Sequence, residues 1–131
     1  GSSIHVGKHH RRLTRWVKGN VEHLGRMPSA FFQVCLSSAG DDAGADQADA
    51  YVDAFVTSTG WHPDAVGLFG GALLYTHYGL VKRTMMKSIA DSSGLDTDVH
   101  QDFDYTDYRA VAQFAKDVAA LLGQPSKAVS A

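Results

Sequence analysis

The stretch that decides the fold is residues 27–37, which read MPSAFFQVCLS. After the proline, aromatic and apolar residues follow one another without a charge, which is typical of a buried β-strand. A second apolar run, AVGLFGGALL, occupies residues 65–74, and we predict a strand there that ends at Gly70-Gly71. Each run is long enough for a strand and far too short to cross a bilayer. The fold is therefore expected to contain at least two buried strands.

Amphipathic helices flank and separate these two runs. Apolar residues recur at spacings of three and four, the helical period, in residues 12–24, 48–56, 78–90 and 106–122. The small and acidic residues 39–47 are expected to form a loop or a helix entrance, and residues 91–104 a connecting loop. Either Thr106 or Asp107 is suited to cap the last helix. Strands that alternate with helices predict an α/β fold with a parallel sheet.

The predicted sheet looks incomplete. Two parallel strands cannot form a stable core for several helices, because parallel sheets are normally covered on both faces. We therefore expect the sequence to begin inside a domain whose N-terminal strands are missing. On this interpretation residues 1–123 form a partial domain and residues 124–131 a C-terminal tail.

Composition excludes several classes of protein. With 44% hydrophobic and 20% charged residues, the chain is too apolar to be wholly disordered. A net charge of −2 lacks the basic excess of most nucleic-acid-binding domains. The single cysteine, Cys35, cannot form an intrachain disulfide and is consistent with a reducing cytosol. No Gly-x-Ser-x-Gly, phosphate-loop or Cys-x-x-Cys pattern occurs. His5, His9 and His10 have no acidic or cysteine partner nearby, so no metal site is expected.

Four motifs, in order along the chain, carry a resemblance to a known family. They are Gly1-Ser2-Ser3-Ile4-His5-Val6-Gly7-Lys8-His9-His10; Met27-Pro28-Ser29-Ala30-Phe31-Phe32; Trp61-x-Pro63-Asp64 with Gly70-Gly71-Ala72-Leu73-x-Tyr75; and Thr97-Asp98 with Tyr105-Thr106-Asp107. Together they resemble the menaquinone-dependent protoporphyrinogen IX dehydrogenases, also called protoporphyrinogen oxidases, which have a flavodoxin-like domain. The resemblance runs from residue 1 to about residue 122.

This resemblance implies a flavodoxin-like α/β sandwich of three layers, with FMN as the cofactor. The implied activity is that of an oxidoreductase in haem biosynthesis, which oxidises a porphyrinogen substrate and transfers electrons to menaquinone. The implied location is the cytoplasm, in peripheral contact with the inner face of the cell membrane, as a monomer or a homo-oligomer and without a nucleic-acid partner. Two alternatives remain open. One is a flavodoxin-like electron carrier or quinone reductase without a porphyrin substrate, and the other is a non-catalytic flavodoxin-fold interaction domain.

The cofactor-binding residues follow from the resemblance and from the rule that ligands bind beyond the carboxyl ends of parallel strands. They are Ser2, Ser3, Ile4, His5, Gly7, Leu36, Ser37 and Ser38, which are expected to border the flavin ring. The alternative for the first group is an ordinary surface loop that follows a strand. No catalytic residue is identified.

One feature of the family has no counterpart in this sequence. The Thr/Ser/Gly-rich loop that holds the FMN phosphate is absent, and Gly40-Asp41-Asp42 cannot replace it because carboxylates repel a phosphate. We therefore expect this chain alone to bind FMN poorly and to be inactive.

A second group of residues is expected to contact substrate or membrane: His9, His10, Gly71, Tyr75, Lys82 and Arg83. Histidine titrates near neutral pH, so His9 or His10 could tune the flavin or meet the substrate. Gly70-Gly71 either shapes a cleft or only allows tight packing. Lys82 and Arg83 share a predicted helix with apolar residues, which is typical of an interfacial helix, although a solvated helix face looks the same.

Overall fold

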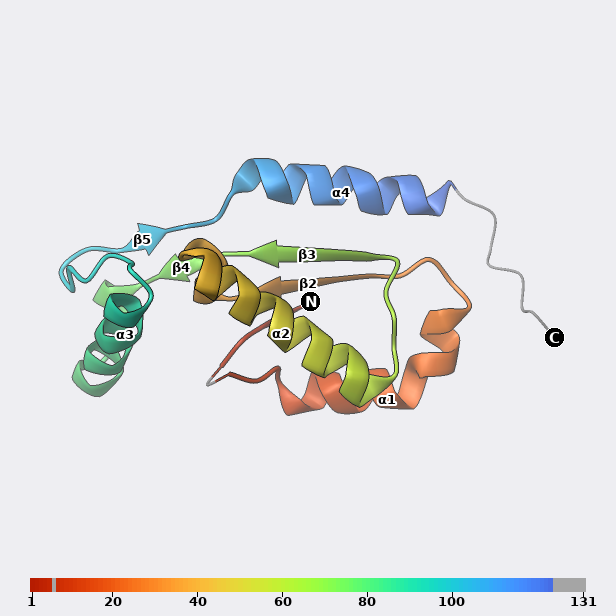
Figure 1. The fold of residues 1–131 in the computed structure, drawn as a ribbon, viewed down its shortest axis with the longest axis horizontal. Helices are drawn as coiled ribbons and strands as arrows, with labels where there is room; N and C mark the ends of the chain where they lie inside the picture. The colour runs from red at the N-terminus through yellow and green to blue at the C-terminus, as the bar shows by residue number, and fades with distance from the viewer. Residues whose placement is uncertain (6, 124–131) are drawn as a thin grey trace.

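The computed structural model describes residues 1–5 and 7–123, so the predicted tail at 124–131 lies outside the described residues. Its centre is a parallel sheet in the order β1 (Ser2–Ser3), β2 (Ala30–Val34) and β3 (Ala65–Phe69). Helices α1 (Arg11–Gly25) and α2 (Asp42–Thr59) lie on one side of this sheet, and α4 (Tyr108–Leu122) lies on the other (Figure 1). The predicted α/β sandwich of three layers with a parallel sheet is confirmed.

The main core lies between the sheet and the first two helices. Phe31 of β2 is almost fully buried, and its ring stacks on Phe55 of α2 with the ring centroids 4.8 Å apart. Val17 of α1 and Trp61 complete this cluster. Gln33, on the same face of β2, is fully buried and its Nε2 donates to the carbonyl oxygen of Ala48, 3.0 Å away. Successive side chains of β2 therefore point to opposite faces of the sheet, and those of Phe31 and Gln33 point into this core.

The opposite face of the sheet is covered over β3. Phe69 of β3 meets Phe114 of α4 edge to face, with the ring centroids 5.7 Å apart. Gly67 lies under the same ring, and a Cβ at this position would stand 3.1 Å from Phe114 Cδ2. Phe32 of β2 points to this face as well and stays 41% exposed, because α4 packs chiefly on β3.

The apolar run at residues 65–74 does not form one strand. β3 ends at Phe69, and Ala72–Leu73 form a separate strand, β4, that pairs antiparallel with β5 (Phe103–Asp104). Gly71 breaks the run because its φ of 73° lies in the left-handed region that favours glycine. The predicted connecting loop at 91–104 is therefore corrected: its last two residues are a strand.

Residues 72–104 make a satellite beside the sheet. The short helix η2 (Tyr75–His77) and helix α3 (Leu80–Ser92) follow β4, and the predicted helix at 78–90 is confirmed with a shift of two residues. This satellite has its own buried cluster of Leu73, Tyr75 and Ala90. No helix in residues 1–5 and 7–123 has the length and apolar content needed to span a membrane.

Helix ends follow from local capping. The Asp41 side chain accepts the N–H of Gly44 at 3.0 Å, so α2 begins at Asp42, and most of the segment at 39–47 is helix rather than loop. Before it stands the short helix η1 (Leu36–Ala39). Asp107 caps α4 by accepting the N–H groups of Arg109 and Ala110, which settles the predicted choice between Thr106 and Asp107.

Candidate functional site

Three segments leave the parallel sheet at one edge, directly after β1, β2 and β3. The N–H of Ile4 donates to Val34 O, and the N–H of Cys35 donates to Phe69 O, both at 2.9 Å. In the sheet register, Val34 lies opposite Phe69. The exits of the two predicted strands are therefore side by side, as a common site requires. This is the edge at which open parallel sheets bind ligands.

The first exit holds most of the predicted cofactor-binding residues. Ser2 and Ser3 are placed differently from the prediction, because they form β1 and pair with Gln33 and Val34 instead of lying in the loop after the strand. His5 exchanges backbone hydrogen bonds with Lys8, at 3.0 and 3.2 Å, which closes a tight turn.

Glycine is required in this turn. The φ of Gly7 is 70°, a left-handed conformation that a side chain would strain. The Nε2 atom of His5 lies 2.9 Å from the hydroxyl of Ser3, so the imidazole is held back toward the strand. The N–H of Ile4 and both backbone polar groups of His5 are paired within the sheet and this turn, so the turn presents a fixed backbone surface at the mouth of β1.

The two histidines predicted to contact substrate have structural contacts: His10 caps α1, and His9 packs on α2. His10 is the N-cap of α1, and its Nδ1 accepts the N–H of Arg12 at 3.2 Å. The His9 ring packs against Phe55, with centroids 4.7 Å apart, and its Nε2–H donates to Tyr51 O at 3.3 Å. Burial lowers the pKa of His9 below its ordinary value of 6.5, so the ring is neutral at pH 7.

The second exit is the short helix η1. Leu36, Ser37 and Ser38 are all half-buried there, and the hydroxyl of Ser37 donates to Gln47 Oε1 at 3.1 Å. The hydroxyl oxygen of Ser38 is buried and has no hydrogen-bond partner among the described residues. A buried hydroxyl without a partner costs stability, so it is a candidate to bind a polar ligand atom. Cys35 is buried as a free thiol and packs as a small apolar residue.

These two exits fit the ring of a flavin better than its phosphate. The fixed backbone of the His5 turn is suited to pack against a flat ring, and the unpartnered Ser38 hydroxyl is suited to a nitrogen or oxygen atom of that ring. The neighbouring N-terminus of α2 would be the natural anion site. However, the Asp41 carboxylate already accepts the Gly44 N–H there, and Asp42 follows it. This placement agrees with the expectation that Gly40-Asp41-Asp42 is not a phosphate loop.

The third exit is packed tightly. A Cβ on Gly71 would stand 2.5 Å from Val34 Cγ1, and one on Gly70 would stand 2.7 Å from Tyr105 O. Of the two readings of this glycine pair, close packing is the one that these contacts support. Tyr75 is 0% exposed, and its hydroxyl donates to Asp96 O at 3.0 Å. Such burial is incompatible with the predicted contact of Tyr75 with substrate or membrane.

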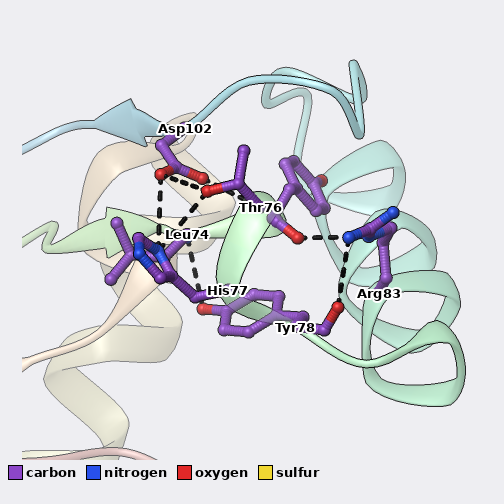
Figure 2. A network of polar contacts seen from close by, with 7 residues as sticks. Leu74, Thr76, His77, Tyr78, Arg83 and Asp102 are labelled. Atoms are coloured by element: carbon purple, nitrogen blue, oxygen red, sulfur yellow. Dashed lines mark hydrogen bonds and ion pairs between the residues drawn. The ribbon is translucent and has the colours of Figure 1, made fainter.

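Lys82 and Arg83 have different surroundings on α3. Arg83 donates from Nε to Tyr75 O at 3.1 Å and from Nη2 to Tyr78 O at 3.2 Å, so its guanidinium holds η2 against α3 (Figure 2). Lys82 is exposed, with its Nζ 4.2 Å from the ring centroid of Tyr78. Around it, Leu80 and Val81 are 81% and 87% exposed. An exposed face of mixed basic and apolar side chains is typical of an interfacial helix.

Sequence reasoning missed a polar network around Asp102. Its carboxylate accepts the Thr76 N–H at 2.9 Å and the Thr76 hydroxyl at 2.7 Å, and His77 Nδ1 lies 3.5 Å away (Figure 2). Hydrogen bonds from the N–H and hydroxyl of Thr76 lower the pKa of Asp102 below its ordinary value of 3.8. Thr76 and Asp102 are 26 positions apart, and no local pattern in the sequence joins them. In the described part of the chain no group of three His, Cys, Asp or Glu side chains is placed to hold a metal ion.

Comparison with known proteins adds independent information. A flavodoxin-domain family model matches residues 1–100. The chain is 35% identical over 126 residues to protoporphyrinogen IX dehydrogenase [quinone] of Escherichia coli (strain K12). The aligned region covers 96% of this chain and 70% of that protein. It is 36% identical over 121 residues to the protein of the same name from Leishmania major. That alignment covers 92% of this chain and 52% of that protein. No solved structure gives a significant match.

Proposed function

We propose the function of this chain from one premise: it belongs to the flavodoxin-domain family. Its relatives are oxidoreductases named for protoporphyrinogen IX and a quinone. We infer that this chain is part of an FMN-dependent oxidoreductase of haem biosynthesis that oxidises protoporphyrinogen IX and passes the electrons to menaquinone. The observation that supports this most directly is the meeting of three strand exits at one edge of the sheet.

FMN is proposed to lie with its ring against the first two exits. Ile4, His5 and Gly7 would contact one side of it, and Leu36, Ser37 and Ser38 would border the other. Ser2 and Ser3 would act from the end of β1, where Ser3 holds the His5 ring. The flavin supplies the redox chemistry when it is bound. The residues of this chain would orient the ring and exclude water from one of its faces.

Helix α3 is the proposed point of contact with the quinone or the membrane surface. Leu80 and Val81 present apolar side chains to solvent, and the ammonium group of Lys82 is exposed beside them. Such a surface is suited to an apolar electron acceptor in a membrane with an anionic face. Arg83 would support this surface by holding η2 in place.

The test is an anaerobic assay of protoporphyrinogen IX oxidation, with FMN in excess and a menaquinone analogue as the acceptor, followed by porphyrin fluorescence. Without excess FMN this chain is expected to be inactive, because it binds the cofactor poorly. With FMN in excess, the expected result is slow turnover that depends on both FMN and quinone. The porphyrin assignment is wrong if the bound flavin passes electrons from a different donor to the quinone but the protein does not oxidise protoporphyrinogen IX. The alternative, an electron carrier or quinone reductase, then stands.

A matched pair of variants tests the placement of the ring. Gly7 and Gly60 both have left-handed backbones, with φ of 70° and 72°, but Gly60 ends α2 at the opposite end of that helix from the strand exits. Gly7→Val should weaken FMN binding by about tenfold because it distorts the turn at the mouth of β1. Gly60→Val imposes similar backbone strain away from the site and should leave FMN binding unchanged. Equal loss in both variants would contradict the proposed ring position.

A further inference from the structure

The first half of α1, with the turn before it, carries a dense group of exposed basic side chains. We define the α1 basic face as Lys8, Arg11, Arg12, Arg15 and Lys18, all of which are exposed. The whole chain has 12 lysines and arginines and a net charge of −2, yet these five cations lie within one short segment. The positive charge is therefore local to this helix and is not a property of the protein as a whole.

Within the described part of the chain, no carboxylate forms an ion pair with the α1 basic face. Among residues 1–5 and 7–123, the ion pairs are Arg26 with Glu22 and His77 with Asp102, and neither involves it. A shallow hollow of about 520 Å³ beside Arg12 is lined only by lysine, arginine and histidine. In the neighbouring hollow of about 480 Å³, the side chains that α2 contributes, such as Tyr51 and Ala54, are uncharged. Such an uncompensated field attracts anionic partners.

Helix stability does not account for this arrangement. The N-terminus of a helix carries partial positive charge, so cations in the first turn are unfavourable and acids are preferred there. The first turn of α1 contains Arg11 and Arg12 and no acidic residue. These charges therefore oppose the helix that holds them, and a role outside folding explains their presence better.

An exposed tryptophan borders the basic face. Trp16 lies one helical turn after Arg12, so the two share one side of α1, and it is 56% exposed, whereas Trp61, the other tryptophan, is 6% exposed. Tryptophan beside arginine and lysine on a surface helix is characteristic of proteins that lie on a bilayer. The face is a helix side with shallow hollows, which suits a broad surface better than a small ligand.

We propose that the α1 basic face, with Trp16 at its border, docks this protein on a bilayer that contains anionic phospholipid. This surface is distinct from α3, the proposed point of contact with the quinone or the membrane surface. Binding through α1 would be electrostatic, sensitive to salt and dependent on the negative lipid. It requires neither FMN nor porphyrinogen, so it can be tested whether or not the proposed activity is correct.

The experiment measures co-sedimentation of the full chain with phosphatidylglycerol–phosphatidylcholine vesicles, and with vesicles of phosphatidylcholine alone. The variant Arg11→Gln/Arg15→Gln is compared with Arg109→Gln/Lys116→Gln, which removes the same charge from α4 on the other side of the sheet. The first pair should weaken binding to the anionic vesicles about thirtyfold, because each basic residue near such a surface contributes about fivefold. The second pair should change it little, and high salt should abolish it.

Tryptophan emission supplies a second measurement. Vesicles with phosphatidylglycerol should shift the emission of the wild type to shorter wavelength, and Trp16→Phe should remove that shift, because Trp61 is already buried. Equal binding to phosphatidylcholine vesicles, or equal loss in the two charge variants, would overturn the proposal. So would loss of binding in Lys82→Gln/Lys87→Gln but not in Arg11→Gln/Arg15→Gln, since α3 would then be the docking element.

Discussion

At the scale of the residue, two of the motifs that carry the family resemblance, residues 27–32 and residues 61–64, are joined by hydrogen bonds. The indole Nε1–H of Trp61 donates to the Ser29 hydroxyl at 3.2 Å, and the Asp64 carboxylate accepts the Ser29 N–H at 2.9 Å. Both contacts are shielded from solvent, where hydrogen bonds matter most. They fasten the start of β2 to the start of β3, which fixes the register that brings the two exits together.

Removal of the Ser29 hydroxyl tests this link. Ser29→Ala leaves the buried Trp61 N–H without a partner, so the free energy of unfolding should fall by about 1–3 kcal/mol. The control is Ser58→Ala, since the exposed Ser58 bonds only to a carbonyl of its own helix. Chemical denaturation followed by circular dichroism measures both. If the two alanine variants lost the same stability, the bond to Trp61 would not be what matters at Ser29.

At the scale of the element, the network around Asp102 joins the residue directly before β5 to η2. A carboxyl group whose pKa is lowered in the folded state stabilises the fold above its unfolded pKa, and the contribution is lost as pH falls through the folded pKa. The hydrogen bonds from Thr76 lower the pKa of Asp102 below 3.8, so this link is complete at neutral pH and weakens as the pH falls below 3.8. The satellite is therefore expected to be firmly attached at neutral pH.

Thr76→Val tests the acid dependence of this link. The variant removes one of the two hydrogen bonds from Thr76 to the Asp102 carboxylate, and the backbone N–H remains. The pKa of Asp102 should rise part of the way toward 3.8, which an NMR titration of its carboxyl carbon measures. Thr57→Val, an exposed change on α2, is the control and should leave the titration unchanged. No rise in Thr76→Val would show that the hydroxyl does not set this pKa.

The elements differ in how far the sequence predicts them. The hydrophobic period predicts α1, α4, β2 and β3 because each buries a continuous stripe or face of its own. Strands β1 and β5 are two residues long, and only their distant partners define them. The convergence of the exits was predictable because parallel strands end at one edge. The roles of His9, His10 and Tyr75 could not be predicted from the sequence, because helix capping and burial depend on neighbours that lie elsewhere in the sequence or the fold.

At the scale of the whole molecule, the described residues provide surfaces for a flavin ring without an anion site beside them. The exit of β1 presents the fixed His5 turn and the exit of β2 presents the Ser38 hydroxyl, and the adjacent N-terminus of α2 is occupied by Asp41. The phosphate of FMN should therefore contribute little to binding by this chain. Weak binding of the cofactor would follow from charge and geometry alone.

Comparison of FMN with riboflavin, which lacks the phosphate, tests that expectation. The two should bind this chain with about equal affinity in a fluorescence titration, and neither should stay bound through gel filtration. A flavodoxin that retains FMN, passed through the same column, is the control. A flavin band that travels with this chain, together with much tighter binding of FMN than of riboflavin, would mean that a phosphate site exists.

The chain enters and leaves the satellite built from residues 72–104 at one place beside the sheet, and Leu36 of η1 also packs against its buried cluster. The N–H of Tyr105 donates to Gly71 O at 2.8 Å, and β4 pairs with β5 just beyond. Because the chain departs and returns at the same place, changing the length of this segment adds little closure entropy. Its buried cluster is also separate from the one beneath the sheet. A change of length within residues 72–104 should therefore leave the sheet that presents the strand exits unchanged.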